Sequence, residues 1–408
     1  MSSFSIPLTG LESASTELNT IANNLSNMNT TAFKSQAVSF TDLFYQQIGS
    51  SGSGNPLEVG AGTQVGATST DFTEGSINST GSASDVALNG NGFFVLQNGA
   101  GALYTRDGSF TLSSTGALTS QAGLPVMGYP VVNGIVNTNA PLTAIQIPVG
   151  QVEQPAATGN FSMTANLDAS AAVGTSVPAP IKLYDSLGIS HVATVTFTKT
   201  GANTWNYSIA LPAGDATGGA NLTGTLTFNA SGDLISPAAS VAGISFTGLS
   251  DGGNNMTLNW NLYGSNNQPT ITQFSASSDV SATSQDGYTS GQYTGFTIDS
   301  TGLVSAQFSN SQTSPIGQLA LANVTNLQGL QVLGGNSYAT TLASGAASIG
   351  VAGTGGLGTI QDDALEQSNV NISTQFSDLI IAQQAYEASS KAVTTMDTVS
   401  QDTMNMIH

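Results

Sequence analysis

The sequence predicts a mainly β, multidomain protein with α-helical termini. The N- and C-terminal helices are expected to pair as a coiled-coil-like layer, with two β-domains inserted between them. Three observations support this prediction. Apolar residues recur at helical spacing near both ends of the chain, short alternating runs separated by Gly and Asn fill the middle, and only 7% of the 408 residues are charged. Ordinary soluble domains carry about 25% charged residues.

The N-terminal segment has an apolar seam whose members are spaced alternately by three and four residues, as in a helix that packs along one face. Its outer faces carry Ser, Thr and Asn. The pattern predicts a helix of roughly 24 residues, too poor in ion pairs to be stable alone. The seam residues are Leu11, Ala14, Leu18, Ile21, Leu25 and Met28.

The C-terminal segment repeats this arrangement. Asn371 is a suitable N-cap, and neither Gly nor Pro interrupts residues 371–408, so one long helix is expected there. Its apolar residues recur mostly at spacings of three, four or seven: Ile372, Phe376, Leu379, Ala382, Tyr386, Val393, Met396 and Ile407.

The middle of the chain has the alternation of β-strands. Runs at 92–96, 192–198, 205–209 and 222–228 are typical, and the last alternates strictly up to a turn at 229–232. A Gly/Ser run at 49–55 is expected to be a flexible link. The predicted division is a terminal helical assembly domain (1–45 and 364–408), a signature β-domain (46–145 and 287–363) and an inserted outer β-domain (146–286).

Composition excludes whole classes of function. Twenty-four acidic residues against five basic ones give a net charge of −19, which excludes nucleic-acid binding. There is no cysteine, so disulfides and thiolate chemistry are excluded. We expect no membrane insertion, because no apolar run reaches about 20 residues. The first residues lack a signal-peptide pattern, so export is expected to proceed without cleavage of one.

Few residues offer chemistry. The two histidines, His191 and His408, have no paired ligand spacing, so no metal site is expected. Gly353, Gly355 and Gly358 match a dinucleotide-binding pattern but lack the surrounding strand–helix–strand sequence, so a linker is favoured. Spacing alone leaves a glycosidase-type carboxylate pair open. We expect no catalytic, cofactor-binding or metal residue, and no enzyme.

Two terminal apolar seams favour assembly. Neither helix has enough partner surface within its own segment, and a pair of helices would still expose apolar side chains. The interpretation that we favour is that the seams pack on sister copies in a polymer. The alternative is a helical cap within one chain that has no role in assembly.

Residues 22–34, 85–130 and 353–396 together resemble one family, the bacterial flagellar rod, hook and hook-associated proteins. Residues 22–34 resemble the N-terminal signature of this family, with Ala32 where Gly is usual, and residues 85–130 resemble its first β-domain. Residues 353–396 resemble its C-terminal signature, with Asp363 in place of Gly and Gln384 in place of Arg. The matching residues include Asn23, Asn24, Asn27, Thr30, Phe33, Lys34, Gly90, Gly92, Phe93, Phe94, Arg106 and Gly108.

The middle of the chain narrows the resemblance. Residues 181–206 and 226–234 resemble the inserted domain of the hook proteins in this family, a segment that the shorter distal rod subunits lack. The resemblance implies an extracellular hook subunit that polymerises into a curved tube and passes torque from rod to filament. It also implies as partners many copies of the chain, the rod, the hook cap, the hook–filament junction proteins and the flagellar type III export apparatus. A rod or hook-associated subunit, or a secreted β-rich adhesin, is the alternative.

Two signature positions carry open roles. Arg106 is the sole arginine of the sequence, and we expect it either to pair with an acid across a subunit joint or to lie solvated in a hairpin. Phe33 and Lys34 follow the first helix and could anchor it to the β-domain. The alternative for Phe33 is ordinary core packing.

Overall fold

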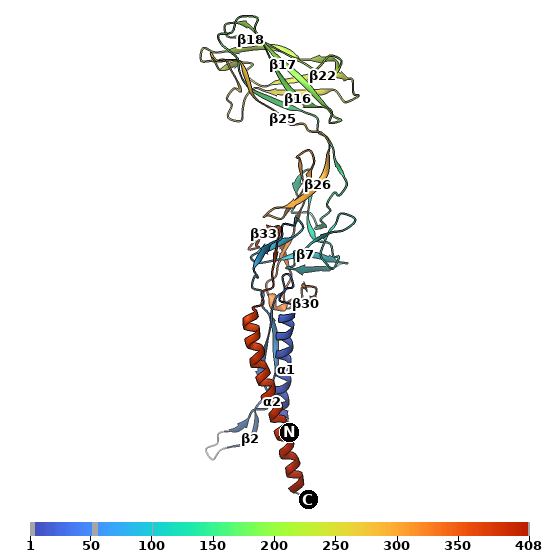
Figure 1. Cartoon of the computed structure of the whole chain (residues 1–408), viewed down its shortest axis with the longest axis vertical. Coiled ribbons are helices and arrows are strands. Elements are labelled where there is room, and N and C mark those ends of the chain that lie inside the picture. Colours follow the sequence, from blue (N-terminus) through green and yellow to red (C-terminus); the bar gives the residue numbers. More distant parts are fainter. Residues whose placement is uncertain (1–4, 51–55, 100, 407–408) are drawn as a thin grey trace. The chain divides into compact units, whose positions relative to one another are not determined.

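The computed structural model describes residues 5–50, 56–99 and 101–406. The chain forms two compact units (Figure 1). Unit 1 contains residues 1–149, 295–306 and 314–408, and unit 2 contains residues 150–294 and 307–313. Both units are rich in strands, and the two helices lie at the ends of the chain and pack together, so the predicted fold class is confirmed. The boundaries of the three predicted domains stay a prediction.

The two helices of unit 1 lie side by side and antiparallel (Figure 1). They are α1 (Ser5–Ser26) and α2 (Ile372–Met406). The Nδ2 atom of Asn24 donates to Oε1 of Gln375 at 3.0 Å, joining the C-terminal end of α1 to the first turn of α2. A Cβ added to Gly10 would lie 3.2 Å from Oγ of Ser389, so the helices are also close near the start of α1.

These two contacts fit one antiparallel register, which places Ser5 opposite Thr394. The last turns of α2 therefore extend beyond the first described residue of α1. The N-cap prediction is confirmed, because Oδ1 of Asn371 accepts a hydrogen bond from the Thr374 amide at 3.2 Å. Among the described residues, neither helix is both long enough and apolar enough to cross a membrane.

The N-terminal helix α1 has 22 residues, close to the roughly 24 predicted, and occupies only part of the predicted assembly segment 1–45. It ends at Ser26, and the chain turns before strand β1 (Gln36–Asp42), which pairs antiparallel with β4 (Thr63–Thr70). The turn contains Ala32 with φ of +54°, a left-handed conformation that a continuing helix does not use. Likewise, the C-terminal segment predicted from 364 begins as strand β34 (Ala364–Glu366) and becomes helical only at Ile372.

The predicted flexible link at 49–55 falls partly outside the described residues, which omit 51–55. The chain on either side of that gap is extended. Strands β2 (Gln46–Ser50) and β3 (Pro56–Val59) pair antiparallel there. The described part of this segment is therefore a two-stranded ribbon.

The β-part of unit 1 is built on a six-stranded sheet with short ribbons around it. The order of that sheet is β30 (Gln331–Gly334), β31 (Ser337–Ala339), β8 (Gly101–Thr105), β7 (Phe93–Asn98), β29 (Leu321–Asn323) and β32 (Ser348–Gly350). The ribbons are β34 with β5 (Ile77–Ser79), β33 (Thr359–Asp362) with β6 (Val86–Asn89), and β9 (Thr111–Leu112) with β10 (Leu118–Thr119).

Further strands complete unit 1 and lead to unit 2. Strand β11 (Met127–Val132) pairs with β12 (Ile135–Val136), with β13 (Thr143–Ala144) and with β28 (Thr313–Leu319). The boundary between the units falls within β26 (Gly291–Ile298) and β27 (Leu303–Phe308) and at the start of β28. A short 3₁₀ turn, η1 (Leu327–Gly329), precedes β30.

The core of unit 1 is aromatic. Phe94 and Phe110 meet edge to face with ring centroids 5.2 Å apart, and both are buried. Phe93, on the neighbouring position of β7, packs against Phe72 and Tyr338. Because adjacent residues of a strand point to opposite faces, Phe93 and Phe94 secure both faces of the sheet at once.

Unit 2 consists of two packed sheets around one apolar core. The first has the order β19 (Ala216–Ala220), β22 (Val241–Leu249), β23 (Met256–Asn261), β15 (Asn160–Asn166) and β24 (Ile271–Thr272), with β25 (Asp279–Gln285) also paired to β15. The second has the order β16 (Ser176–Tyr184), β17 (Ser190–Gly201), β18 (Thr204–Ala210), β20 (Thr223–Phe228) and β21 (Leu234–Ser236). The two-residue strand β14 (Val152–Glu153) pairs with β26.

Strict alternation of buried and exposed residues along these strands fills the space between the sheets, as the runs at 192–198, 205–209 and 222–228 predict. Trp205 and Trp260 are fully buried there, and Trp260 stacks on Phe161 with centroids 5.8 Å apart. Unit 2 therefore has a complete core of its own.

The two departures from the family's glycines occur at positive φ: Ala32 at +54° and Asp363 at +49°. A Cβ in this region costs about 1 kcal/mol, which glycine avoids. We expect Ala32→Gly to raise the free energy of unfolding by about 0.5–1 kcal/mol in a urea titration. Ala37→Gly, on exposed strand β1, should lower it, because glycine weakens a strand. Equal effects of the two substitutions would contradict this assignment of strain.

Candidate functional site

The predicted seam residues of the helices are only partly covered within one chain. Ile21 is buried, Leu11, Leu18 and Leu25 are half-buried, and Met28 lies beyond the end of α1 and is exposed. On α2, Leu379 and Val393 are half-buried, whereas Phe376, Tyr386 and Met396 are exposed. Ile407 lies outside the described residues. The role of these residues in assembly stays a prediction.

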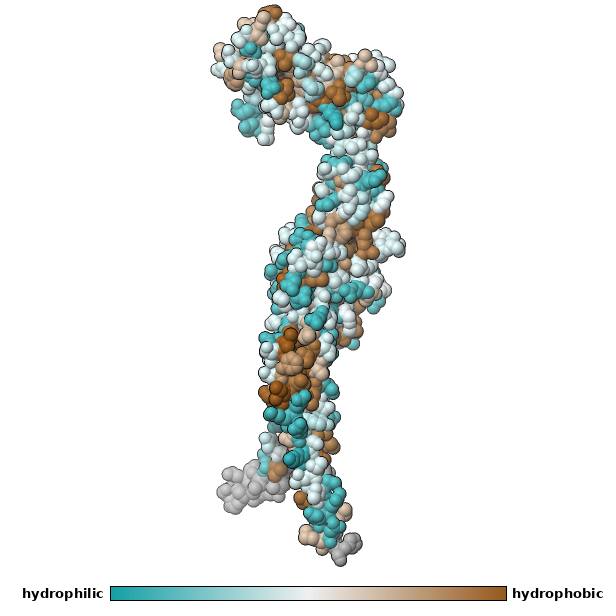
Figure 2. Space-filling view, viewed as in Figure 1, coloured by the Kyte–Doolittle hydropathy of each residue, from teal (hydrophilic) through white to brown (hydrophobic). Residues whose placement is uncertain are grey.

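A larger set of apolar side chains on the helix pair remains exposed. Figure 2 shows apolar residues gathered over the helical part of unit 1. Ile380 and Ile381 are 55% and 62% exposed, which is high for isoleucine in a folded protein. The exposed apolar residues on α1 and α2 are Ile6, Leu8, Ile372, Phe376, Ile380, Ile381, Tyr386, Met396, Val399, Met404 and Met406.

Four of the exposed side chains on α2 lie to either side of the face that meets α1. The buried Ala382 marks the side that faces α1. At 3.6 residues per turn, Phe376 and Ile380 lie about 120° and 160° around the helix from Ala382 in one direction. Ile381 and Val399 lie about 100° away in the other direction. The helix pair therefore presents two separate apolar flanks.

A buried cluster of charges joins the helix ends to the β-part of unit 1. Oε1 of Glu366, on β34, lies 2.5 Å from Nζ of Lys34, and Oε2 of Glu366 lies 3.0 Å from Nε of Arg106. All three side chains are at least 95% buried. Oε1 of Glu366 also accepts a hydrogen bond from the Gly75 amide, and Lys34 donates to the Thr73 carbonyl. One carboxylate thus ties together distant segments of the chain.

Arg106 is buried, so the expectation of a solvated arginine is wrong, and the acid that it meets, Glu366, belongs to its own chain. Its guanidinium is buried and donates to the carbonyls of Leu88, Gly90 and Gly92 as well as to Glu366. The planar, multiply donating guanidinium holds the β6–β7 turn in place. Sequence spacing could not reveal this, because Glu366 lies 260 residues away.

The signature glycines shape the backbone around Arg106. Gly90 and Gly92 have φ of +99° and +130°, which turns their carbonyls toward the guanidinium. A Cβ at Gly108 would collide with the carbonyl oxygen of Val86. These positions of the signature therefore serve close backbone approach.

Two asparagines link the helix ends to the same region. The side chain of Asn24 hydrogen-bonds both backbone groups of Gln36, at 2.8 and 2.9 Å, so it fixes the exit from α1. Asn369, just before α2, accepts from the Ser35 amide and donates to the Asp71 and Thr73 carbonyls. Both ends of the chain are therefore held to each other and to the β-part.

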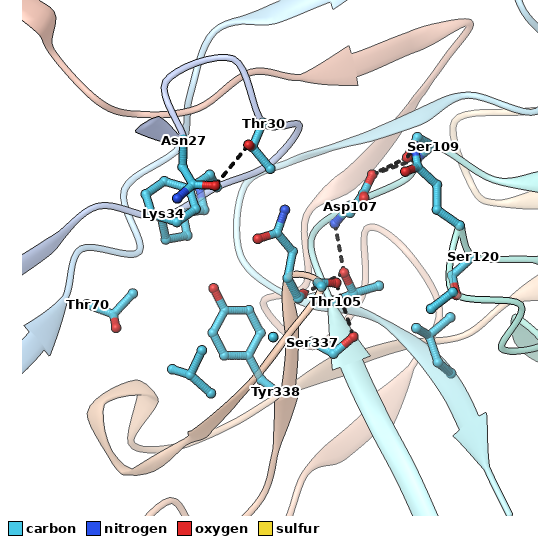
Figure 3. Close-up of a pocket in the computed structure, with 18 of the residues that line it drawn as sticks. Asn27, Thr30, Lys34, Thr70, Thr105, Asp107, Ser109, Ser120, Ser337 and Tyr338 are labelled. Atoms are coloured by element: carbon cyan, nitrogen blue, oxygen red, sulfur yellow. Dashed lines mark hydrogen bonds between the residues drawn. The ribbon is translucent and has the colours of Figure 1, made fainter. Parts of the chain in front are cut away.

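The remaining signature residues border a cleft of about 430 Å³ in unit 1. Figure 3 shows Asn27, Thr30 and Lys34 on one side of it and Asp107 and Ser109 on the other. Asn23 and Phe33 also line it, and Phe33 is half-buried rather than part of the core. Most polar side chains here bond to their own chain: Thr30 donates to Asn27, and Ser109 donates to Asp107.

Burial shifts the titration of this region. It lowers the pKa of Lys34, with the opposing attraction of Glu366 as the next cause. Burial, followed by the charge of Glu366, raises the pKa of Tyr338 to about 12. Desolvation also raises the pKa of Asp107. Lys34, Asp107 and Tyr338 all line the cleft of about 430 Å³, whereas Glu366 is not among its lining residues.

The sequence points to most of this joint but not to its centre. Lys34 and Arg106 stand out in it, whereas Glu366 and Asn369 appear only as members of the C-terminal signature. The scarcity of basic residues was the one feature of the sequence that could have indicated a shared acidic partner. Three of the five basic residues, Lys34, Arg106 and Lys391, lie in the family signatures, and any of them that is buried needs an acidic partner. The glycine run at 353–358 forms a turn between β32 and β33, as expected of a linker.

Comparison with known proteins defines the class. Four family models match the chain in order: the flagella basal body rod protein (residues 7–34), the flagellar hook protein FlgE/F/G D1 domain (87–202), the flagellar basal body protein FlaE D2 domain (157–288) and the flagellar basal body rod FlgEFG protein C-terminal (361–406). These models together cover most of the chain, including both helices. The matched families are rod and hook proteins of the bacterial flagellum, so the chain is of that class.

Full-length relatives identify the family. The chain is 34% identical to the flagellar hook protein FlgE of Escherichia coli, with 99% of each chain covered. It is 32% identical to that of Treponema pallidum, with 96% of each covered. The crystal structure of Helicobacter pylori flagellar hook protein FlgE2 has the same fold over 71% of this chain and all of its own, with a TM-score of 0.54 and 16% identity. The chain belongs to the flagellar hook protein family.

This membership establishes the function in general terms. The chain is a subunit of the flagellar hook, a polymeric structure that is part of the flagellum outside the cell. The family is one of structural proteins and not of enzymes. Of the alternatives that the sequence left, the hook subunit is the one confirmed.

Removing the shared carboxylate tests the joint. We expect Glu366→Ala to lower the free energy of unfolding by about 3–5 kcal/mol, because it leaves two buried cations without a counter-charge. Asp362→Ala removes an exposed acid on the adjacent strand β33 and should change the free energy by less than about 0.5 kcal/mol. Urea unfolding of dilute, monomeric protein measures both. Similar small changes in the two variants would contradict the central role of Glu366.

Proposed function

We propose that the terminal helices drive polymerisation by packing their two apolar flanks against neighbouring copies. The observation that carries this proposal is the exposure of Ile380 and Ile381 on separate flanks of α2. Covering a half-exposed isoleucine contributes about 1 kcal/mol, and one such contact on each flank recurs in every subunit. Exposed apolar patches of this kind mark protein–protein contact surfaces.

The two flanks also favour an open polymer over a closed dimer. A two-fold dimer would use one patch twice, whereas two different patches allow a head-to-tail contact that repeats along a helix. The end of α2 beyond Thr394 provides further apolar surface for such contacts, because its residues extend past the described part of α1. Val399, Met404 and Met406 are 56%, 63% and 79% exposed. Sister copies supply the partner surface that one chain lacks.

In the assembled hook, we assign three layers to the predicted domains. Residues 1–45 and 364–408 form the inner layer of packed helices, and residues 46–145 and 287–363 set the spacing between subunit rows. Residues 146–286 form the outermost contacts. The Lys34–Glu366–Arg106 cluster connects the first two layers within each subunit and passes torque between them.

Bending of a rotating tube requires outer contacts that slide without breaking. Surfaces rich in Ser, Thr, Asn and Gly, with few ion pairs, suit such contacts, because they lack strong fixed points. A composition with only five basic residues in 408 supports this role. The curved tube then acts as a universal joint between rod and filament.

Export and partners follow from the same proposal. The subunit leaves the cell unfolded through the flagellar type III apparatus, without cleavage of a signal peptide. Helices that are stable only with partners, and a sequence without cysteine, suit passage in an unfolded state. The rod, the hook cap and the hook–filament junction proteins are the partners at the ends of the tube.

Single substitutions on each flank test the proposal. We expect Ile380→Gln and Ile381→Gln each to raise the protein concentration needed for polymerisation roughly fivefold, because each removes a contact that contributes about 1 kcal/mol per subunit. Light scattering measures the onset, and electron microscopy shows whether tubes form. The melting temperature of the monomer should stay unchanged, since both side chains are exposed.

The matched control is Leu342→Gln. Leu342 is fully exposed in unit 1 and lies outside both helices, so its replacement should leave polymerisation unchanged. If neither isoleucine substitution shifts the onset relative to this control, the helix flanks are not the assembly surface.

A further inference from the structure

One end of unit 2 gathers loops from both of its sheets. Asp185 begins the turn between β16 and β17, and His191 is the second residue of β17. Asp251 lies in the turn between β22 and β23, in the other sheet. The two turns are linked directly, because the Asn254 amide donates to Oγ of Ser186 at 2.9 Å.

Three side-chain atoms converge between these turns. They are Oδ2 of Asp185, Nε2 of His191 and Oδ2 of Asp251, all within 4.8 Å of one another. Each atom is buried and has no hydrogen-bond partner. Asp185 is fully buried and His191 is 4% exposed. The Nε2 and Asp251 Oδ2 atoms lie 2.9 Å apart but without the alignment of a hydrogen bond.

The other polar atoms of these groups are already engaged. Oδ1 of Asp185 accepts hydrogen bonds from the amides of Leu187 and Ile189, and Oδ1 of Asp251 accepts one from the Gly253 amide. Nδ1 of His191 lies 3.3 Å from Oδ2 of Asp215. Each side chain is therefore oriented by its outer atom and directs its remaining atom to one common point.

We propose that Asp185, His191 and Asp251 bind a divalent cation, and that Zn²⁺ is the ion they fit. Nitrogen and oxygen ligands of zinc lie about 2.0–2.2 Å from the ion, so two neighbouring ligands of a tetrahedral site are about 3.3–3.6 Å apart. The separation of 2.9 Å between Nε2 of His191 and Oδ2 of Asp251 is a few tenths of an ångström shorter than this, so a bound ion would move these two atoms slightly apart. The carboxylate of Asp215 behind Nδ1 provides the outer contact typical of metal-bound histidine.

Neither an ion pair nor a calcium site fits the cluster as well as zinc does. A protonated His191 paired with Asp215 and Asp251 would leave Oδ2 of Asp185 as a buried, unpartnered carboxylate oxygen, which is costly. Calcium needs six to eight oxygen ligands, and the three converging atoms include a nitrogen. A zinc ion would satisfy all three atoms and would clamp the two sheets of unit 2 together. Because the chain has no cysteine, a disulfide cannot link the two sheets, and the bound ion would provide that link instead.

The test is zinc titration of the full chain at a concentration at which it is monomeric, after treatment with EDTA. Every protein carries His408→Gln, so that His191 is its one histidine. Isothermal titration calorimetry with ZnCl₂ should give one site per chain, and saturating zinc should raise the melting temperature of unit 2 by several degrees. Separate titrations with CaCl₂ and MgCl₂ should give binding at least tenfold weaker.

Two variants and one control complete the design. Asp185→Asn and Asp251→Asn should each weaken zinc binding at least tenfold, whereas Asp279→Asn, an exposed acid on β25 of the same unit, should leave it unchanged. Circular dichroism without metal identifies any variant that fails to fold. If Asp185→Asn does not fold, the result for Asp251→Asn decides the test, because Asp251 is the less buried of the two acids. Absence of zinc binding by the folded parent, equal binding by the folded Asp251→Asn variant, or stronger binding of calcium would overturn the proposal.

Discussion

The constraint on which this structure depends is that its terminal helices cannot cover their own apolar surface. The two helices of one chain form a single antiparallel pair, and a pair of helices buries one stripe on each member. Ile380 and Ile381 lie outside that stripe, about 100° apart around the helix, and the last turns of α2 extend past the first described residue of α1. The exposed surface is tolerable in water only until another copy arrives. We therefore propose that the helical ends carry the contacts between subunits.

The second requirement is a rigid connection between those helices and the β-part of unit 1. A hydrophobic contact alone would resist separation but would not fix orientation. The carboxylate of Glu366 supplies orientation, because its two oxygens engage Lys34 and Arg106 in different directions. Burying one anion with two cations is expensive, and the cost is offset only because backbone carbonyls of Thr73, Leu88 and Gly90 accept the remaining donors. A connection that transmits force needs side chains that are each held by several contacts, as these three are.

Much of this could be predicted from the sequence, since it rests on periodicity. The 3.6-residue recurrence of apolar residues located both helices, and strict alternation located strands such as β17 and β20. What failed depended on contacts between distant residues. The turn at Ala32 that ends the N-terminal segment is stabilised by its amide bonding to the Glu366 carbonyl. Arg106 and the Asp185–His191–Asp251 cluster likewise combine residues that no spacing rule brings together.

The most direct test of the central claim is electron microscopy of a chain reduced to residues 30–371. This variant keeps Lys34, Arg106 and Glu366 and the strands of unit 1 and unit 2, but it lacks the two helices. Circular dichroism should show an intact β-structure, and concentrated samples should contain monomers only, while the full chain forms tubes under the same conditions. Tubes formed by the shortened chain would show that the β-parts suffice for assembly, and would contradict the account.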